Sequence, residues 1–338
     1  MAGGIGSRFW PMSTPDKPKQ FIDVLGLGKS LLQLTVERFE GVIPNGNIWI
    51  VTSKNYKEIV KEQIPSIDDS HVLLEPCMRN TAPCITYVAF KIRERYPDAN
   101  LVFSPADHIV IDTEHFRAII HRALDYTEKS DAIVTLGMFP TRPETGYGYI
   151  KAASGNEDVR RVEAFKEKPD LETAKQYISE GNYYWNAGIF VWNVDTVISE
   201  IGKYVPELTE RFDSLKSYFY TCEEQKAIDR EFPLCPNISI DYAVMEKSTK
   251  VYVCPAEFGW SDLGTWGSLY TLMTKDSNSN AVIGNNVKLI DCRDNIVHVP
   301  QERNVILQGL KGYIVVESGG RLLICRKQDE QKIKEWNK

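Results

Sequence analysis

The sequence has no excess of positive charge. Its 40 Lys and Arg residues are outnumbered by 46 Asp and Glu residues, which gives a net charge of −6. This balance provides no long-range attraction to nucleic acid or to an anionic membrane surface. We therefore expect neither as a partner, and we expect any anionic ligand to be held by a local cluster of basic side chains.

Long apolar runs and paired cysteines are missing as well. No window approaches the ~18 apolar residues that a membrane span needs, and the first residues do not follow the pattern of a secretory signal. The 7 cysteines include no C-x-x-C pair, which argues against a zinc ribbon or a disulfide framework. The sequence predicts free thiols and a cytoplasmic location.

Two common nucleotide-binding motifs are also absent. The segment "GLGKS" ends like a Walker A loop, but Asp23 stands where that loop requires its first glycine. A dinucleotide fingerprint that starts at Gly4 would need a third glycine where Phe9 stands. Neither a P-loop nor a Rossmann cofactor site is therefore indicated.

The sequence does contain a regular alternation of short apolar runs and amphipathic segments. Strands are expected at 47–52, 71–76, 100–105 and 131–138, and helices at 31–40, 55–64, 82–96 and 115–124. Ser30 is the expected N-cap of the first helix, and Gly41 lies beyond its end. This alternation predicts an α/β fold with a doubly wound, mostly parallel sheet.

The pattern changes in the second half of the chain. Turn-rich aromatic stretches after about position 145 suggest an insertion or lid, followed by helical segments near 195–231. From about position 280, short Val and Ile runs separated by Gly, Asn and Asp predict a small β-rich unit, and a faint hexad spacing favours a left-handed β-helix. We expect a main domain at 1–275 and a small unit at 280–338.

A glycine-rich and basic stretch opens the chain. "MAGGIGSRFWPMSTPDKPKQF" contains Gly3, Gly4, Gly6, Arg8 and Lys19. Glycines allow backbone N–H groups to approach phosphate oxygens, Arg8 can contact two oxygens at once, and Lys19 supplies a point charge. The combination suits a triphosphate, and the alternative is a glycine turn with solvated basic residues.

The glycine-rich stretch is the first of eight motifs that follow one another along the chain. "GGIGSRFWPMS…KPKQF", "EPCMRNTAP", "SPADHIV", "ETGYGYI", "FKEKPD", "YYWNAGIFVW", "SIDYAVMEKS" and "FGWSDLGTWGSL" together resemble the sugar-phosphate nucleotidyltransferase family over nearly the whole chain. The resemblance implies a GT-A-like Rossmann-type domain and the synthesis of GDP-mannose and pyrophosphate from GTP and mannose 1-phosphate. It also implies a homo-oligomer, with a dimer as the expected form. The alternatives are another sugar 1-phosphate or nucleotide, or a non-catalytic sugar-nucleotide sensor.

The resemblance also assigns roles to residues. Asp107 follows an apolar strand at its carboxyl end, and Asp262 corresponds to the second family aspartate at the same ion; two carboxylates suit Mg²⁺. His108 is not expected to be a ligand, because Mg²⁺ prefers oxygen. Arg8 and Lys19 are the implied catalytic residues. The implied nucleotide-binding residues are Gly3, Gly4, Gly6, Glu75, Arg79, Asn80 and Thr81, and the implied sugar-phosphate residues are Gly146, Glu167, Lys168, Asn186 and Asp241.

Read without the resemblance, several of these residues have simpler interpretations. Asn80 or Thr81 can cap a helix, Arg79 can pair with a surface glutamate, and Glu167 and Lys168 can belong to a solvated charged run. The glycine-rich stretch also begins without a preceding strand, whereas relatives carry further residues there that form the central strand. We expect an N-terminally extended form to be more stable and more active.

Overall fold

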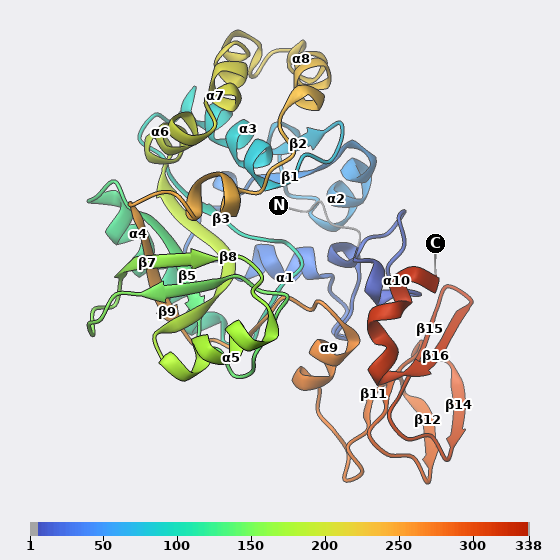
Figure 1. Cartoon of the computed structure of the whole chain (residues 1–338). Coiled ribbons are helices and arrows are strands. Elements are labelled where there is room, and N and C mark those ends of the chain that lie inside the picture. Colours follow the sequence, from blue (N-terminus) through green and yellow to red (C-terminus); the bar gives the residue numbers. More distant parts are fainter. Residues whose placement is uncertain (1–5, 337–338) are drawn as a thin grey trace.

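The computed structural model describes residues 6–336. Its largest element is a six-stranded sheet that Figure 1 shows at the centre of the main body. In spatial order its strands are β3 (Asn100–Phe103), β8 (Tyr183–Asn193), β5 (Ile133–Met138), β9 (Val251–Ala256), β7 (Arg160–Lys166) and β6 (Tyr149–Ala152). A separate parallel pair is formed by β1 (Ile50–Ser53) and β2 (Val72–Glu75).

The α/β class is confirmed, but the expectation of a mostly parallel sheet is wrong. Among the six strands only β5 and β9 pair in parallel. Strand β8 lies antiparallel between β3 and β5, so that Val191 pairs with Val102 on one side and Val134 on the other. The aromatic run expected to form a lid is therefore a central strand, and its burial on both faces explains its apolar composition.

The predicted helices of the first half are present. They are α1 (Leu31–Glu37), α2 (Lys57–Gln63), α3 (Thr81–Arg93) and α4 (Thr113–Glu128). Ser30 begins α1 with a capping box, because its hydroxyl accepts from the Gln33 N–H at 3.2 Å while the Gln33 side chain accepts from the Ser30 N–H at 2.9 Å. Helix α4 buries Phe116 and Ile120 beneath its apolar face against the sheet.

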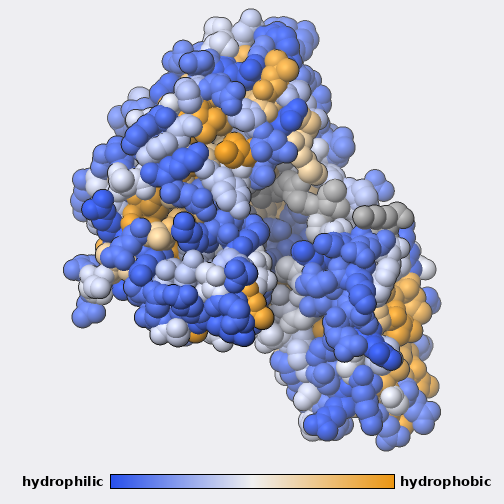
Figure 2. All heavy atoms as spheres, viewed as in Figure 1, coloured by the Kyte–Doolittle hydropathy of each residue, from blue (hydrophilic) through white to orange (hydrophobic). Residues whose placement is uncertain are grey.

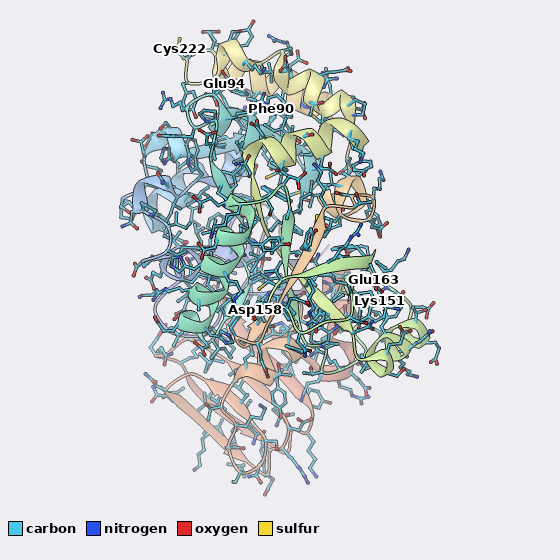
Figure 3. The ribbon with its side chains drawn as sticks, turned by 90° about the vertical axis from the view of Figure 1, so that its left-hand side faces the viewer. Phe90, Glu94, Lys151, Asp158, Glu163 and Cys222 are labelled. Atoms are coloured by element: carbon cyan, nitrogen blue, oxygen red, sulfur yellow. The ribbon has the colours of Figure 1, made fainter. Side chains whose placement is uncertain are left out.

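Helices of the second half cover α3. They are α6 (Val194–Tyr204), α7 (Pro206–Asp213) and α8 (Glu224–Glu231), while α5 (Leu171–Glu180) packs beside β8. Figure 3 shows Cys222 at the outer end of this helical layer, with Phe90 of α3 and Glu94, which caps the end of α3, beneath it. Helix α3 is buried on nearly all sides, which matches its almost continuous apolar sequence. Within residues 6–336, no helix combines the length and the apolarity that crossing a bilayer requires.

The small β-rich unit is also present. One sheet holds β11 (Ala281–Ile283), β13 (Ile296–His298) and β15 (Tyr313–Ser318) in parallel, with β16 (Arg321–Arg326) antiparallel at its edge. A second parallel sheet pairs β12 (Asn286–Ile290) with β14 (Asn304–Gln308). Up to β15 the chain alternates between the two sheets. Ile306, Leu322 and Ile324 are exposed, and Figure 2 shows apolar residues gathered on the outer side of this unit.

The small unit packs against the start of the chain. Phe9 and Leu31 share one apolar cluster with Trp266 of α9 (Trp266–Leu272), Ile314 of β15 and Ile333 of α10 (Ile333–Trp336). The ring centroids of Phe9 and Trp266 lie 4.9 Å apart. The glycine-rich stretch is thus fixed on its apolar side by residues from the other end of the sequence.

Candidate active site

Of the predicted phosphate-loop glycines, Gly3 and Gly4 lie outside the described residues and Gly6 lies within them. Gly6 has φ +65°, and a Cβ atom there would lie 2.6 Å from the Cβ of Lys19. Only glycine fits this close approach at this backbone conformation. Arg8 follows in a short 3₁₀ helix (Ser7–Phe9), and its buried Nε has no hydrogen-bond partner among the described residues.

Lys19 connects the two segments that carry the predicted metal ligands. Its buried Nζ lies 3.1 Å from Asp107 Oδ2, and it donates to the Asp262 carbonyl at 2.7 Å and to the Leu263 carbonyl at 3.0 Å. An ammonium group has three N–H donors, so each has an acceptor. Lys19 therefore holds the loop after β3 beside the loop after β10.

A short strand pair completes this arrangement. β4 (Ile109–Val110) pairs antiparallel with β10 (Trp260–Ser261), which places Asp107 and Asp262 at neighbouring ends of one ribbon. Burial would raise the pKa of Asp107, but the nearby Lys19 ammonium holds that pKa below its ordinary value. The Asp107 carboxylate is therefore ionised at neutral pH.

Tyr147 is a residue of this corner that the sequence analysis missed. Its hydroxyl donates to Asp262 Oδ1 at 2.7 Å, and the same oxygen accepts from the Gly264 N–H at 2.9 Å. Burial, with the nearby Asp262 charge, raises the pKa of Tyr147, so the phenol remains a donor. Tyr147 lies between Gly146 and Gly148 in the "ETGYGYI" motif, from which only Gly146 was predicted to contribute to the site.

His108 contacts Trp260 and lies near Asp107 at this corner. Its Nδ1 accepts from the Trp260 indole N–H at 3.2 Å, and its Nε2 lies 3.7 Å from Asp107 Oδ1. Burial lowers the pKa of His108 despite the two nearby aspartates. A neutral ring with no proton on Nδ1 can accept the Trp260 hydrogen bond.

The donor set can be tested against a metal ion. Within the described part of the chain, no group of three or more His, Cys, Asp and Glu side chains is placed to hold a metal. The predicted ligands are two aspartates, Asp107 and Asp262, which lie at neighbouring ends of the β4–β10 ribbon and in segments that both contact Lys19. This set fits Mg²⁺, which commonly takes one or two carboxylates and completes its shell with water and phosphate oxygens.

A second group of predicted residues lies at the end of β2 and the start of α3. The pKa of Glu75 is raised to about 7 by burial, and its buried Oε1 has no hydrogen-bond partner among the described residues. The Asn80 side chain caps α3 by accepting from the Thr81 N–H at 3.1 Å, as the simpler interpretation predicted. Thr81 Oγ1 accepts from the Ile240 N–H at 2.8 Å, and the Arg79 guanidinium contacts the Pro233 carbonyl.

The predicted sugar residues form a third group. Asn186 of β8 donates from Nδ2 to Asp241 Oδ1 at 3.0 Å, while its Oδ1 accepts from the Thr135 hydroxyl at 3.1 Å. Asp241 begins a π-helical turn (Asp241–Met245), and burial together with the Glu167 charge raises its pKa to about 6. Glu167 in turn contacts the Lys168 ammonium.

Two glycines lie near this group. Gly148, which was not predicted, lies close to the Glu167 carboxylate, whereas the predicted Gly146 lies close to Glu144. A Cβ atom on Gly148 would lie 2.5 Å from Glu167 Oε2, so a larger residue would displace that carboxylate. The N–H of Gly146 instead donates to Glu144 Oε1 at 3.1 Å, at an exposed turn before Tyr147. Gly148 is thus a second residue that the sequence analysis missed.

Several known proteins are similar to this chain over nearly its whole length. A family model described as nucleotidyl transferase matches residues 1–279. A mannose-1-phosphate guanylyltransferase of Salmonella montevideo is 37% identical over 344 residues, which cover 99% of this chain and 71% of its own length. One from Escherichia coli is 34% identical over 345 residues, with the same two coverages. A crystal structure from Thermus thermophilus, described as mannose-1-phosphate geranyltransferase, has a TM-score of 0.90 at 31% identity and covers 100% of this chain and 96% of its own.

Proposed function

Because the chain belongs to the nucleotidyl transferase family, we propose that it makes GDP-mannose and pyrophosphate from GTP and mannose 1-phosphate. Relatives named mannose-1-phosphate guanylyltransferase match 99% of the chain at 34% and 37% identity. The observation that carries the proposal is the Lys19 bridge, which brings Asp107 and Asp262 together beside the glycine-rich stretch from three distant parts of the sequence.

The reaction joins two anions, so the site must offset charge and fix geometry. A sugar-phosphate oxygen attacks the α-phosphorus in line, and pyrophosphate leaves with its electron pair; no protein nucleophile is required. Arg8 and the backbone of the glycine-rich stretch bind the triphosphate, and the Arg8 Nε, which has no partner within residues 6–336, is available to it. Asp107 and Asp262 would hold Mg²⁺, which when bound neutralises phosphate charge.

We assign Lys19, predicted from the sequence as a catalytic residue, to a positioning role. Its three donors are engaged with the Asp107 carboxylate and the backbone carbonyls of Asp262 and Leu263, so it holds together the two segments that carry the aspartates. Tyr147 orients the Asp262 carboxylate through its 2.7 Å hydrogen bond. Both residues act through the aspartates.

The remaining groups are assigned to the base and the sugar. Glu75 and Asn80 would read the hydrogen-bonding edge of guanine, with Arg79 and Thr81 shaping that end of the site. Glu167, Lys168, Asn186 and Asp241 would bind the hydroxyls and phosphate of mannose 1-phosphate, with Gly146 and Gly148 in the adjoining turn.

The experiment that tests this function measures pyrophosphate release from mannose 1-phosphate with GTP, ATP, UTP or dTTP, each with Mg²⁺. GTP should give the highest kcat/KM. A preference for UTP or dTTP would overturn the guanine assignment, and no release from any pair, with sugar-nucleotide binding retained, would favour a non-catalytic sensor. Replacing mannose 1-phosphate by other hexose 1-phosphates then tests the sugar.

We also propose a division into a main domain at 1–275 and a unit at 280–338 that winds as a short left-handed β-helix. The alternation of β11 to β15 between two parallel sheets supports the winding. Exposed Ile306, Leu322 and Ile324 support a homo-oligomer, with a dimer as the expected form. Light scattering of wild type and Ile324→Glu tests the contact, and the cytoplasmic location stays a prediction.

A further inference from the structure

The segment that follows β16 lies against the candidate active site. A 3₁₀ helix, η9 (Lys327–Lys332), leads directly into α10, and Figure 1 shows α10 beside the start of the described chain. We refer to residues 327–336 as the η9–α10 segment. It contacts two elements of the site, namely the short 3₁₀ helix that carries Arg8 and helix α9, which follows Asp262.

The contacts of the η9–α10 segment recur at every third residue. The Lys327 ammonium lies 3.6 Å from the ring centroid of Tyr270 in α9. Glu330 Oε2 accepts from the Gly267 N–H at 2.7 Å. Ile333 is fully buried in the apolar cluster beneath the glycine-rich stretch. Side chains three residues apart eclipse one another along a 3₁₀ helix, so these three contacts come from one face of the segment.

The Glu330 contact fixes the start of α9. Thr265 caps this helix, because its hydroxyl accepts from the Ser268 N–H at 3.1 Å, and Glu330 accepts from the Gly267 N–H in the same first turn. A Cβ atom on Gly267 would lie 3.1 Å from Glu330 Oε1, so the carboxylate approaches the backbone closely. The loop that begins at Asp262 ends in this turn, and Glu330 therefore holds its far end.

This loop has a backbone conformation that needs support from its neighbours. Leu263 has φ +47°, which is uncommon for a residue other than glycine. Such a conformation persists only where the surrounding structure fixes it. On one side, the Leu263 carbonyl accepts from Lys19 at 3.0 Å and its N–H donates to Ser261 Oγ at 3.2 Å. On the other side, the loop is held through the first turn of α9 by Glu330.

We propose that Glu330 is a positioning residue for the Asp262 carboxylate, and that the η9–α10 segment thereby couples the small β-rich unit to the corner formed by Asp107 and Asp262. Glu330 acts through the backbone of α9 and the strained loop. Ile333 supports the glycine-rich stretch through the cluster that it shares with Phe9. The effect on turnover rests on the proposed function, whereas the effect on the loop does not.

The test compares Glu330→Ala and Glu330→Gln with the wild-type chain, and Glu335→Ala, at an exposed position of the same segment, is the matched control. Glutamine keeps an oxygen that can accept from the Gly267 N–H. The main measurement is hydrogen exchange of the Gly264 amide without ligand, since this amide donates to Asp262 and not to Glu330. The kcat and the KM for GTP are then measured with Mg²⁺ on the same proteins.

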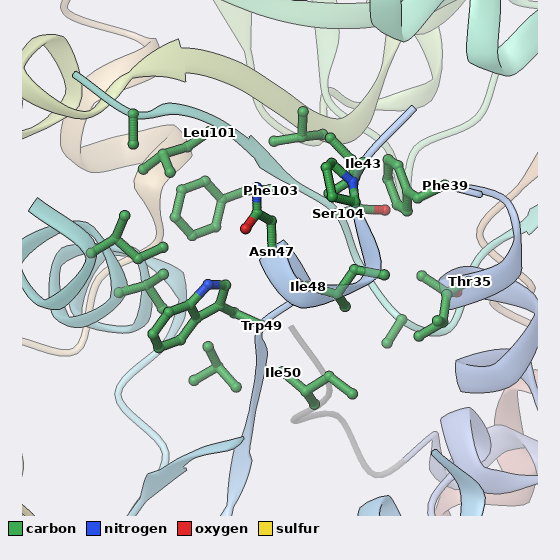
Figure 4. Close-up of a pocket in the computed structure, with 18 of the residues that line it drawn as sticks. Thr35, Phe39, Ile43, Asn47, Ile48, Trp49, Ile50, Leu101, Phe103 and Ser104 are labelled. Atoms are coloured by element: carbon green, nitrogen blue, oxygen red, sulfur yellow. The ribbon is translucent and has the colours of Figure 1, made fainter. Parts of the chain in front are cut away.

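A further control separates local positioning from a general loss of stability. Leu101 of β3 lines an apolar cavity whose walls include parts of β1 and β3 (Figure 4). Leu101→Ala should lower the unfolding midpoint through lost packing. It should leave the Gly264 exchange rate and kcat unchanged at temperatures well below that midpoint. An acceleration at Gly264 equal to that in Glu330→Ala would overturn the proposal.

We expect Glu330→Ala to speed exchange at Gly264 by about 10-fold and to lower kcat by about 10-fold with little change in KM. Glu330→Gln should stay close to wild type. Unchanged Gly264 exchange in Glu330→Ala would overturn the proposal, as would an equal effect in Glu335→Ala or in Glu330→Gln. Faster Gly264 exchange in Glu330→Ala, with no turnover of any nucleotide by the wild-type chain, would uphold the positioning role and contradict the proposed function.

Discussion

Two groups of carboxylates lie in the candidate site, and they are in opposite electrostatic states. Near the glycine-rich stretch, Asp107 faces the Lys19 ammonium and its pKa is lowered. At the Asn186–Asp241 pair, which is the proposed sugar end, Asp241 faces an amide and another carboxylate, Glu167, and burial with the Glu167 charge raises its pKa to about 6. Both aspartates are removed from much of the solvent, so the nearest partner decides the direction of the shift.

This difference corresponds to two tasks. A carboxylate kept ionised by a fixed cation suits metal and phosphate chemistry, where the charge must be present before the ligands arrive. A carboxylate that can hold a proton near neutrality can donate as well as accept, which suits sugar hydroxyls. Glu75, whose pKa is raised to about 7, resembles Asp241 in this respect.

The largest effect is expected from removing the Lys19 ammonium, which is the cation that distinguishes the Asp107 group from the Asp241 group. Lys19→Met should lower kcat by about 10²- to 10³-fold, because neither aspartate is then held in place. It should also cost about 1–3 kcal/mol of unfolding free energy, since Asp107 loses its countercharge. Lys17→Met, at an exposed neighbouring position, is the matched control. An equal loss in both variants would contradict the positioning role.

A smaller, pH-dependent effect is expected at the sugar end. The folded-state pKa of Asp241 exceeds its ordinary value of 3.8, so the folded protein binds this proton more tightly, and the stabilisation is present at low pH and lost as pH rises through about 6. Asp241→Asn should therefore gain stability relative to wild type between about pH 4 and pH 7, by at most about 3 kcal/mol. Thermal melts across this range, with exposed Asp98→Asn as control, measure the gain. A pH-independent difference would show that the shift is absent.

For Glu75 the comparison predicts a change in ligand binding. The ionised carboxylate accepts from guanine N–H groups, so the Kd for GTP should fall by up to about tenfold as pH rises through about 7. Glu75→Gln should bind GTP more weakly and retain only the pH dependence of GTP itself. Calorimetric titrations at several pH values test this, and parallel profiles for the two proteins would exclude Glu75 from base recognition.

The smallest effect is expected from Tyr147→Phe. The variant loses one hydrogen bond to Asp262, while the bond from the Gly264 N–H remains. The cost should be about 0.5–1.5 kcal/mol in kcat/KM, and it should not vary with pH because the raised pKa keeps Tyr147 protonated. Tyr96→Phe, at an exposed position, is the control. A loss beyond about 100-fold would mean that Tyr147 contacts substrate directly.

Local patterns were sufficient for much of the fold. The Ser30 N-cap of α1 and the apolar face of α4 were predicted from neighbouring residues, and the structure confirms both. The antiparallel insertion of β8 was not predictable in this way, because a fully buried strand has no alternation that reveals its direction. Likewise, Gly148 is identified only by its distance from Glu167 in space.

In the candidate site, too, some features follow from the local sequence and others follow only from contacts in space. The residue types at Asp107, Asn186 and Asp241 were available from motifs, and the structure brings Asn186 and Asp241 into contact. The engagement of all three Lys19 donors was not available, because their acceptors include the backbone carbonyls of Asp262 and Leu263. Every residue has a backbone carbonyl, so the residue types do not reveal which carbonyls accept hydrogen bonds. From the sequence, a lysine in a basic loop is therefore interpreted as a phosphate ligand.

The span of the Lys19 bridge has a consequence for biosynthesis. Its ammonium and the Asp262 carbonyl are 243 residues apart in sequence. At ribosomal rates of about 5–20 residues per second, the second partner is made roughly 12–50 s after the first. During that interval the glycine-rich stretch lacks the Lys19 acceptors at Asp262 and Leu263 and the apolar support of Trp266. The nascent chain therefore cannot assemble this corner until residues 262–266 have been synthesised.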